Sequence, residues 1–342
     1  MGATIALAAM VLTGCTSAPT PDQTEAPEEI TGGLDPQPLA EPTTIVINTA
    51  ARIESFTALF LADYMGEFEK ENITVEFTQV ASADALVSLG QNQIQMMGVS
   101  PSASLFNAIG SGVDMRVVFP GYLNNLGEDG WWMSNDVIEN GAESLKGATV
   151  ASAVGPGSGT ILGLAAYLET GGLTVKDVTV QAFPAADVAT ALTQGAVQGA
   201  YITAPVTTVV REAGVAEYVD SMPDGVGSAI AAYVIGPQLL EDTDVAAAVV
   251  RAMARTVITY LDGDYKSDPE MVENIAAALD RTPEEIEATP ALEFDPTFEI
   301  RGDYYTQMQE LWLEVGGLLS YSEPLEPSAV IDTQFIDAVL GK

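Results

Sequence analysis

The chain has 342 residues, long enough for two lobes with separate cores, and it carries 12 Lys and Arg against 48 Asp and Glu. The resulting formal charge of -36 argues against nucleic acid and anionic membrane as binding partners, because both repel a surface of the same sign. The absence of His and the single Cys exclude Ser-His-Asp and Cys-His catalysis and zinc sites built on imidazole or paired thiolates.

The N-terminal part of the chain, up to Pro42, is predicted to carry targeting signals rather than a fold. Ile5–Leu12 is an apolar run too short to span a bilayer, and it leads into Leu-Thr-Gly-Cys at 12–15. This run resembles the lipobox of bacterial lipoproteins, although Met1–Thr4 lacks the usual positive charge. We therefore expect a signal peptide at 1–14, lipidation of Cys15, and a disordered tether over 15–42, where prolines are frequent and aromatic residues absent.

Strands and helices then alternate, which predicts a parallel or mixed sheet wrapped by helices. β-Branched and apolar runs predict strands at Thr44–Thr49, Ile73–Phe77, Ile94–Val99 and Met115–Phe119. Helical spacing predicts helices at Ala58–Phe68, Ala83–Leu89 and Ser104–Ile109. Ser-Pro-Ser at 100–102 is a helix-start signal.

The pattern lapses between Tyr122 and Asn135, which we interpret as the crossing into a second lobe. That lobe repeats the alternation, and Ile230–Ile235 is predicted to return as a strand to the first lobe. The predicted strands of the second lobe are one that ends at Val154 and two that span Val178–Gln181 and Gly199–Thr203. Its predicted helices are one that ends at Glu169 and two that span Ala186–Gln194 and Pro205–Ala213. Only helices follow, at Val245–Leu261, Pro269–Leu279, Pro283–Ala288, Ile300–Val315 and Ala329–Leu340.

A glycine-rich loop, Gly155–Gly159, lies between a predicted strand and a predicted helix that begins at Thr160. Free amides and the positive end of a helix dipole at such a place attract anions. A dinucleotide loop is disfavoured because Thr160 replaces the third glycine and no acidic residue ends the next strand; a nucleophile elbow is disfavoured because no glycine stands two before Ser158. An ordinary turn and a ligand cradle remain open.

Four segments in this order carry a family resemblance. They are LFLADYMGEFEKENITVEF (Leu59–Phe77), NQIQMMGVSPSASLFNAIGSGVDMRVV (Asn92–Val118), ESLKGATVA (Glu143–Ala151) and Gly171–Pro205. Together they resemble the type II periplasmic substrate-binding proteins of ABC importers, in the sulfonate, nitrate and taurine branch. The taurine binders match best, although Asn48 and Thr49 replace an aromatic and polar pair.

The resemblance implies an α/β, two-lobed type II periplasmic-binding-protein fold with a ligand cleft between the lobes and a helical C-terminal tail. The first lobe would comprise 43–125 and 229–342, and the second lobe would comprise 126–228. The resemblance also implies a monomeric, lipid-anchored protein on the extracytoplasmic face of the cell membrane. There it would capture taurine or another short sulfonate and deliver it to an ABC permease and its ATPase, without enzymatic activity, cofactor or metal.

A sulfonate can be held by converging amides and hydroxyls without a full counter-charge. The candidates lie at strand-to-helix junctions, where each is also an ordinary helix cap: Ser82, Ser100, Ser102, Gly157, Ser158, Gly159 and Thr160. For a ligand ammonium, Glu54 is the first choice and Glu128 the second, with Arg52 as the cation that meets an acid group instead. Aromatic walls are expected from Phe56, Trp131, Trp132 and Tyr201, although adjacent Trp131 and Trp132 need not both point inward.

Three alternatives stay open. A thiamine-precursor pyrimidine would suit the same fold and would stack on tryptophan. An enzyme is the second, because porphobilinogen deaminase and a pyrimidine synthase resemble this fold. The third is a sensor or adhesion lipoprotein without a transporter.

Stability is expected to depend on salt, because repulsion among 48 acidic side chains is screened as ionic strength rises. The melting temperature should increase between low-salt buffer and high-salt buffer, as measured by differential scanning calorimetry. An unchanged melting temperature would show that repulsion among the acidic side chains does not destabilise the folded state.

Overall fold

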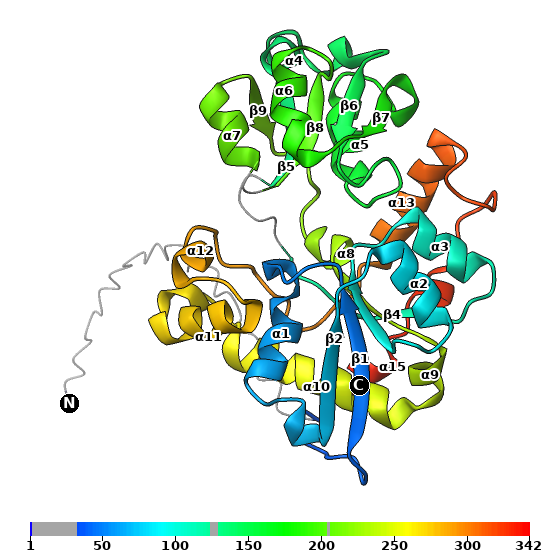
Figure 1. Ribbon diagram of the computed structural model, residues 1–342, viewed down its shortest axis with the longest axis vertical. Coiled ribbons are helices and arrows are strands. Elements are labelled where there is room, and N and C mark those ends of the chain that lie inside the picture. Colours follow the sequence, from blue (N-terminus) through cyan, green and yellow to red (C-terminus); the bar gives the residue numbers. More distant parts are fainter. Residues whose placement is uncertain (2–32, 124–128, 204–205) are drawn as a thin grey trace. The chain divides into compact units, whose positions relative to one another are not determined.

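The computed structural model describes residues 1, 33–123, 129–203 and 206–342, and within this part the strands form two five-stranded sheets (Figure 1). The predictions for the signal peptide, for Cys15 and for the tether up to residue 32 lie outside the described residues.

The first sheet has the strand order β2-β1-β3-β10-β4. Its strands are β1 (Thr43–Thr49), β2 (Ile73–Thr78), β3 (Met96–Val99), β4 (Arg116–Pro120) and β10 (Ala232–Ile235). β1 is parallel to β2 and β3, whereas β10 is antiparallel to both β3 and β4. The sheet is therefore mixed, and the strand predicted to return to the first lobe lies inside it.

The second sheet repeats this order as β7-β6-β8-β5-β9. Its strands are β5 (Gly130–Ser134), β6 (Thr149–Ser152), β7 (Thr179–Ala182), β8 (Gly199–Ile202) and β9 (Ala216–Val219). β5 is antiparallel to β8 and β9, so in each sheet the fourth strand enters antiparallel to its neighbours. The sequence predicted neither β5 nor β9. β5 was missed because it is a short segment within the predicted crossing between the lobes.

Helices cover both faces of the first sheet (Figure 1). Ile45 and Ile47 of β1 belong to the core on one face, while Val46 packs into the core on the other, as the alternation of a strand requires. The first face is covered by α1 (Thr57–Tyr64), α10 (Thr243–Tyr260), α11 (Pro269–Leu279) and α15 (Gln334–Leu340). The second is covered by α2 (Ser82–Gly90), α3 (Ala103–Gly110) and α14 (Pro327–Val330); the short helices α8 (Gly227–Ile230), α9 (Pro237–Glu241) and α12 (Pro283–Glu287) link these elements.

The second sheet separates Trp131 from Trp132, which are adjacent on β5 and lie in different cores. The core on the Trp131 side includes residues of α4 (Asn135–Asn140) and α5 (Ile161–Thr170). The core on the Trp132 side includes residues of α6 (Val188–Thr193) and α7 (Val206–Ala213).

Helix α13 (Gly302–Val315) joins the cores of the two sheets. On one side Phe106 of α3 makes edge contacts with Tyr305, at 5.9 Å between ring centroids, and with Trp312, at 5.4 Å. On the other side α13 packs against α5. One continuous hydrophobic core therefore runs from the first sheet through α13 to the second.

Two predicted helices differ from the structure by more than two residues. The helix predicted over Ala58–Phe68 ends at Tyr64, and Gly66 then adopts a positive φ of 72°. The helix predicted over Ala329–Leu340 is divided into α14 and α15. The break occurs because Ile331 pairs with Val117 of β4 and the Asp332 amide donates to the Val117 carbonyl.

Residues 33–42, predicted as the end of the tether, are held against α10 and against the turn that precedes β2. Arg255 Nη1 donates to the Leu34 carbonyl at 2.7 Å, and Arg251 Nη2 donates to the Gln37 carbonyl at 3.3 Å. The Gln37 amide donates to Glu71 at 3.1 Å. We call residues 33–42 the N-terminal strap. The tether prediction was wrong for these residues, because Arg251 and Arg255 supply donors that the carbonyls of the strap accept.

The arginines that hold the strap are themselves in a buried ion-pair network. Arg251 pairs with Glu71 at 2.7 Å, and Arg255 pairs with Glu67 at 2.6 Å and with Glu71 at 2.8 Å. Burial alone would raise the pKa of Glu67, but hydrogen bonds from Lys70, Arg255 and Tyr260 lower it below its ordinary value. These partners therefore keep the Glu67 carboxylate charged.

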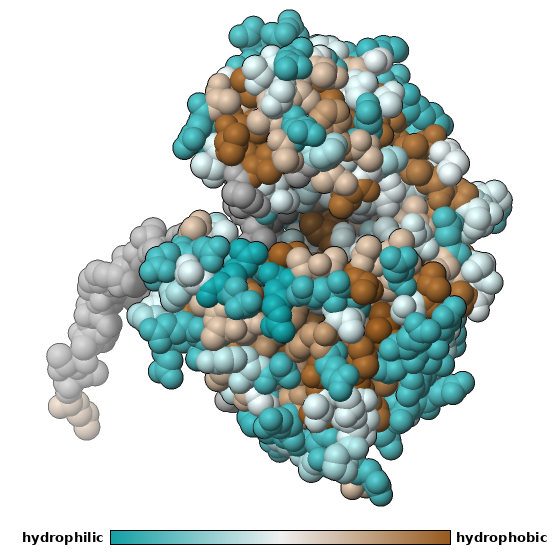
Figure 2. Space-filling model, viewed as in Figure 1, coloured by the Kyte–Doolittle hydropathy of each residue, from teal (hydrophilic) through white to brown (hydrophobic). Residues whose placement is uncertain are grey.

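Hydrophilic residues are spread over the face shown in Figure 2, consistent with the acidic composition. Within the described ranges, no helix is both long enough and apolar enough to cross a bilayer.

Replacing Arg251 with Met should lower the free energy of unfolding by about 3–5 kcal/mol, because it leaves a buried carboxylate undercompensated and releases the strap. Urea unfolding measures the loss. The control is R301M, since Arg301 pairs with Asp303 at an exposed position where an ion pair contributes about 1 kcal/mol or less. Equal losses in the two variants would contradict the importance of the buried network.

Candidate functional site

The loop between β6 and α5 meets the start of α3. The Ala103 amide donates to the Gly157 carbonyl at 2.9 Å, and Ser102 and Ser158 form an isolated antiparallel bridge. The structure thus brings together five of the residues predicted from the sequence, which come from loops of both sheets: Ser102, Gly157, Ser158, Gly159 and Thr160.

The conformation of this loop is fixed by short-range contacts. The hydroxyls of Ser158 and Thr160, both buried, lie 2.6 Å apart in a hydrogen bond, and Trp131 Nε1 donates to the Thr160 carbonyl at 2.9 Å. Gly155 has a φ of 69°, which favours glycine. Gly159 packs so closely that an added Cβ would lie 2.8 Å from Met308 Cε of α13. The loop is therefore held both by the second sheet, through Trp131, and by α13, through Met308.

Two helix N-termini converge here. Ser102 caps α3 as predicted, its hydroxyl accepting from the Leu105 amide at 3.4 Å, and Thr160 is the residue before α5. The positive ends of both helix dipoles therefore meet at the Ser102–Ser158 contact. Neither 98–102 nor 153–160 contains Lys or Arg, so helix dipoles, amides and hydroxyls supply the positive potential in these two segments.

Two buried hydroxyls end equivalent strands of the sheets. Thr49 is the last residue of β1 and Ser152 the last of β6, and each is 0% exposed. Within the described residues, neither hydroxyl has a hydrogen-bond partner. An unsatisfied buried polar group costs about 1–3 kcal/mol. Ser152 was missed by sequence reasoning, although a polar residue shortly before a glycine-rich loop was an available signal.

The other predicted hydroxyl residues do not take part in this contact. Ser82 is exposed and is the first residue of α2, while Ala81 occupies the cap position without a side-chain cap bond. Ser100 is exposed after β3. Their predicted roles as ligand-binding residues stay predictions.

The aromatic residues are arranged differently from the expected ligand walls. Trp131 is 1% and Trp132 2% exposed, and they lie on opposite faces of the second sheet. Phe56 is buried against Tyr233, with ring centroids 5.8 Å apart. Tyr201 makes an edge contact with Trp131 at 5.9 Å, and burial, together with nearby Tyr122 and Asp129, raises the pKa of its phenol. Both tryptophans are core residues, because each completes the packing of one face.

The predicted charged residues of the β1–α1 loop point into the protein. Lys266 Nζ lies 2.6 Å from Glu54 Oε2, and the Thr289 hydroxyl donates to Glu54 Oε1 at 2.5 Å. Arg52 Nη1 donates to the Ala278 carbonyl at 2.7 Å. Glu54 was expected to face a ligand ammonium, but both of its oxygens bind partners in the protein, since a buried carboxylate requires them. Glu128 lies outside the described residues.

Asn48, one of the departures from the family pattern, holds the β2–α2 loop. Its side-chain oxygen accepts from the Val80 amide at 3.0 Å and from the Thr78 hydroxyl at 3.1 Å, and its amide nitrogen donates to the Val80 carbonyl at 3.3 Å. The polar side chain is thus satisfied internally and positions a loop at the carboxyl end of β2.

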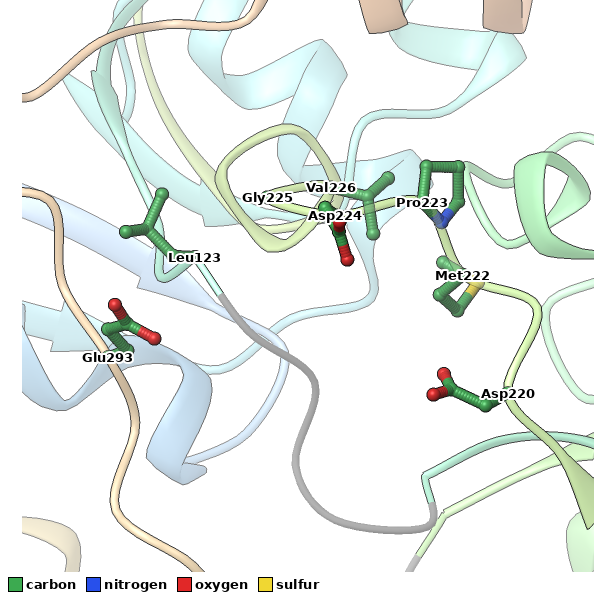
Figure 3. A pocket seen from close by; sticks show the side chains of 8 residues that line it. All are labelled: Leu123, Asp220, Met222, Pro223, Asp224, Gly225, Val226 and Glu293. Atoms are coloured by element: carbon green, nitrogen blue, oxygen red, sulfur yellow. The ribbon is translucent and has the colours of Figure 1, made fainter. Parts of the chain in front are cut away.

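A pocket of about 340 Å³ lies where the chain passes between the sheets (Figure 3). The carboxylates of Asp220, Asp224 and Glu293 border it, together with Leu123 and Met222. This lining disfavours an anion, and none of the predicted site residues that the structure describes belongs to it. In the portion of the chain that is described, no group of three or more acidic or Cys side chains is arranged to hold a metal ion.

Comparison with known proteins gives one family and a set of related folds. The model of the family described as NMT1/THI5 like matches residues 53–290. No curated protein sequence matches the chain. Among solved structures, the periplasmic aliphatic sulphonate binding protein SsuA from Escherichia coli has a TM-score of 0.62 at 16% identity, covering 88% of this chain and 100% of that chain.

Two further structures share the fold. The periplasmic nitrate-binding protein NrtA from Synechocystis PCC 6803 has a TM-score of 0.56 at 14% identity, covering 89% of this chain and 86% of that one. The desulfurization enzyme DSZB has a TM-score of 0.57 at 15% identity, covering 87% and 99%. The expected periplasmic-binding-protein fold, and the resemblance that the sequence motifs indicated, are confirmed.

Replacing Thr49 with Val should raise the free energy of unfolding by about 1 kcal/mol, because a methyl group replaces a buried hydroxyl that lacks a partner. Thr57 provides the matched control: it is similarly buried, but its hydroxyl donates to the Glu54 carbonyl at 2.7 Å, so T57V should lose about 1 kcal/mol. Urea unfolding of both variants measures the difference. A loss of stability in T49V would contradict the interpretation that the buried Thr49 hydroxyl lacks a hydrogen-bond partner.

Proposed function

The chain belongs to the NMT1/THI5-like family, and we propose that it is the extracytoplasmic solute-binding component of an ABC importer. The observation that carries this proposal is the convergence of the N-termini of α3 and α5 at the Ser102–Ser158 contact. Loops from two separate sheets supply that contact, so a solute bound there would link both sheets.

The proposed solute is a small organic anion, taurine or another short sulfonate. A sulfonate keeps its negative charge and has three oxygens, which suits donors arranged around a point. Ser102, Ser158 and Thr160 offer hydroxyls beside two positive helix ends, without a cation in these two segments that would pair more tightly. The fold shared with SsuA, whose name states aliphatic sulphonate binding, supports this choice.

Delivery to a membrane permease and its ATPase completes the proposal. Lipidation at Cys15 would hold a monomer at the outer face of the cell membrane through the residues before the strap. The proposed lobes are residues 43–125 with 229–342, and residues 126–228, which would close on the solute by hinge motion.

Binding is proposed rather than catalysis, even though the enzyme DSZB shares the fold. The sequence holds no His, and its single Cys is the predicted lipidation site. A solute carrier needs only a site that binds and releases, which dipoles and hydroxyls provide without a nucleophile.

A thermal-shift screen tests the proposed solute. The panel comprises taurine, ethanesulfonate, nitrate, sulfate, bicarbonate and a thiamine-precursor pyrimidine. A true solute raises the melting temperature with the logarithm of its excess over Kd. Stabilisation by a sulfonate alone supports the proposal, and stabilisation by the pyrimidine alone replaces it with the alternative solute.

Replacing Ser102 with Asp should abolish sulfonate binding while the protein stays folded. Asp caps a helix about as well as Ser, but its carboxylate would repel an anion about 4 Å away by about 4 kcal/mol, which corresponds to a loss of affinity of about 1,000-fold. S102N is the matched control, because Asn has the same shape and capping ability without the charge. Isothermal titration with taurine and ethanesulfonate measures both variants, and unchanged affinity in S102D would place the anion elsewhere.

A further inference from the structure

The loop between β1 and α1, which runs from Ala50 to Phe56, is held in place by a segment that is distant in the sequence. Arg52 reaches the Ala278 carbonyl at the end of α11. Glu54 receives Lys266 Nζ at 2.6 Å and the Thr289 hydroxyl at 2.5 Å. The two charged side chains of the loop thus face the segment 266–290, so this segment determines where the loop lies.

Lys266 is the centre of this attachment. Its ammonium contacts the Glu54 carboxylate, the Ile286 carbonyl at 2.8 Å, the Thr289 carbonyl at 3.0 Å and the Pro290 carbonyl at 3.2 Å. The Thr289 hydroxyl oxygen lies 2.9 Å away. The side chain is 8% exposed. So many oxygen contacts leave the ammonium little freedom, and they fix the position of Glu54 through charge as well as geometry.

The loop in turn shapes the carboxyl ends of two strands. The turn Glu54–Phe56 places Phe56 against β3, where an added Cβ on Gly98 would lie 3.0 Å from the phenyl ring and 3.0 Å from Thr49 Cγ2. Ser55 lies beside the hydroxyl of Tyr122. A shift of this turn would therefore move the surroundings of Thr49 and of the β3 end that leads to Ser102.

We propose that Lys266 is a positioning residue for solute binding: it holds the β1–α1 loop in its binding conformation through Glu54 without touching the solute. This inference rests on the proposed function. In this role Glu54 connects the β1–α1 loop to Lys266 inside the protein and does not bind the solute. The affinity for the solute is then predicted to depend on Lys266, which lies on the segment between α10 and α11.

A second buried ion pair provides a matched comparison at the other end of the same strands. Arg251 binds Glu71, just before β2 begins, where the Asn72 carbonyl also accepts from the Thr43 amide at the start of β1. Both pairs join a buried cation to a buried glutamate beside the first sheet. If burial of an ion pair mattered only for stability, loss of either pair would affect binding in the same way.

The experiment compares K266M with R251M by two measurements. The first is hydrogen exchange at the amides of Phe56 and Thr57, which donate to the Ile53 and Glu54 carbonyls and so report on the turn. The second is titration with taurine and with ethanesulfonate. In K266M we expect exchange at both amides to rise by about tenfold or more and affinity to fall by about tenfold or more; in R251M affinity should stay within about twofold.

T289V keeps the test decisive if K266M does not fold, because it removes one donor to Glu54 and leaves the ion pair. It should show the same faster exchange at Phe56 and Thr57 and a smaller loss of affinity. Unchanged exchange in both variants would overturn the positioning role, as would equal losses of affinity in K266M and R251M.

The two proposals fail in different ways. If no sulfonate binds the unmodified protein, the proposed solute is wrong, while the exchange measurement still decides whether Lys266 fixes the turn. If sulfonates bind the unmodified protein and K266M equally well, the positioning role fails and the proposed function stands.

Discussion

Scarcity of cations is the constraint on which the rest of this structure depends. The chain has 12 Lys and Arg for 48 acidic residues, yet Arg251, Arg255 and Lys266 are used in buried ion pairs beside the first sheet. A buried carboxylate without a partner is costly, so these cations determine which segments can pack. The N-terminal strap owes its position to the two arginines, and Glu54 of the β1–α1 loop owes its position to Lys266.

The same scarcity shapes the candidate site. The loops at Ser102 and Ser158 contain no cation, so attraction for an anion has to come from the two helix ends, the amides and the hydroxyls. Such donors are neutral as groups and hold an anion less tightly than a guanidinium would. That property suits the proposed role as a solute carrier, which must release the bound solute. Helix α13 supports the arrangement, because Met308 packs against Gly159 while Trp312 packs on Phe106 of α3, which covers the first sheet.

Local patterns accounted for much of this arrangement. The alternation of strands and helices, the cap at Ser102 and the glycine-rich loop could be predicted because each depends on residues within one turn or one strand. β5 escaped prediction because its apolar run, Trp131 to Met133, is short and follows a polar, glycine-containing segment. Only its pairing with β8 and β9 makes it a strand.

The sequence by itself determined the fold class, the order of most of the elements and the hydroxyl-bearing residues at the strand-to-helix junctions, because those signals are local. The direction of individual side chains was decided by the tertiary structure. Glu54 and Arg52 stand in the predicted loop, but their partners belong to a segment in the C-terminal part of the chain. Trp131 and Trp132 are adjacent in the sequence, yet the pleat of β5 sends them into separate cores. Long-range pairing of charges and packing of sheet faces leave no mark on a local pattern, so only the folded chain reveals them.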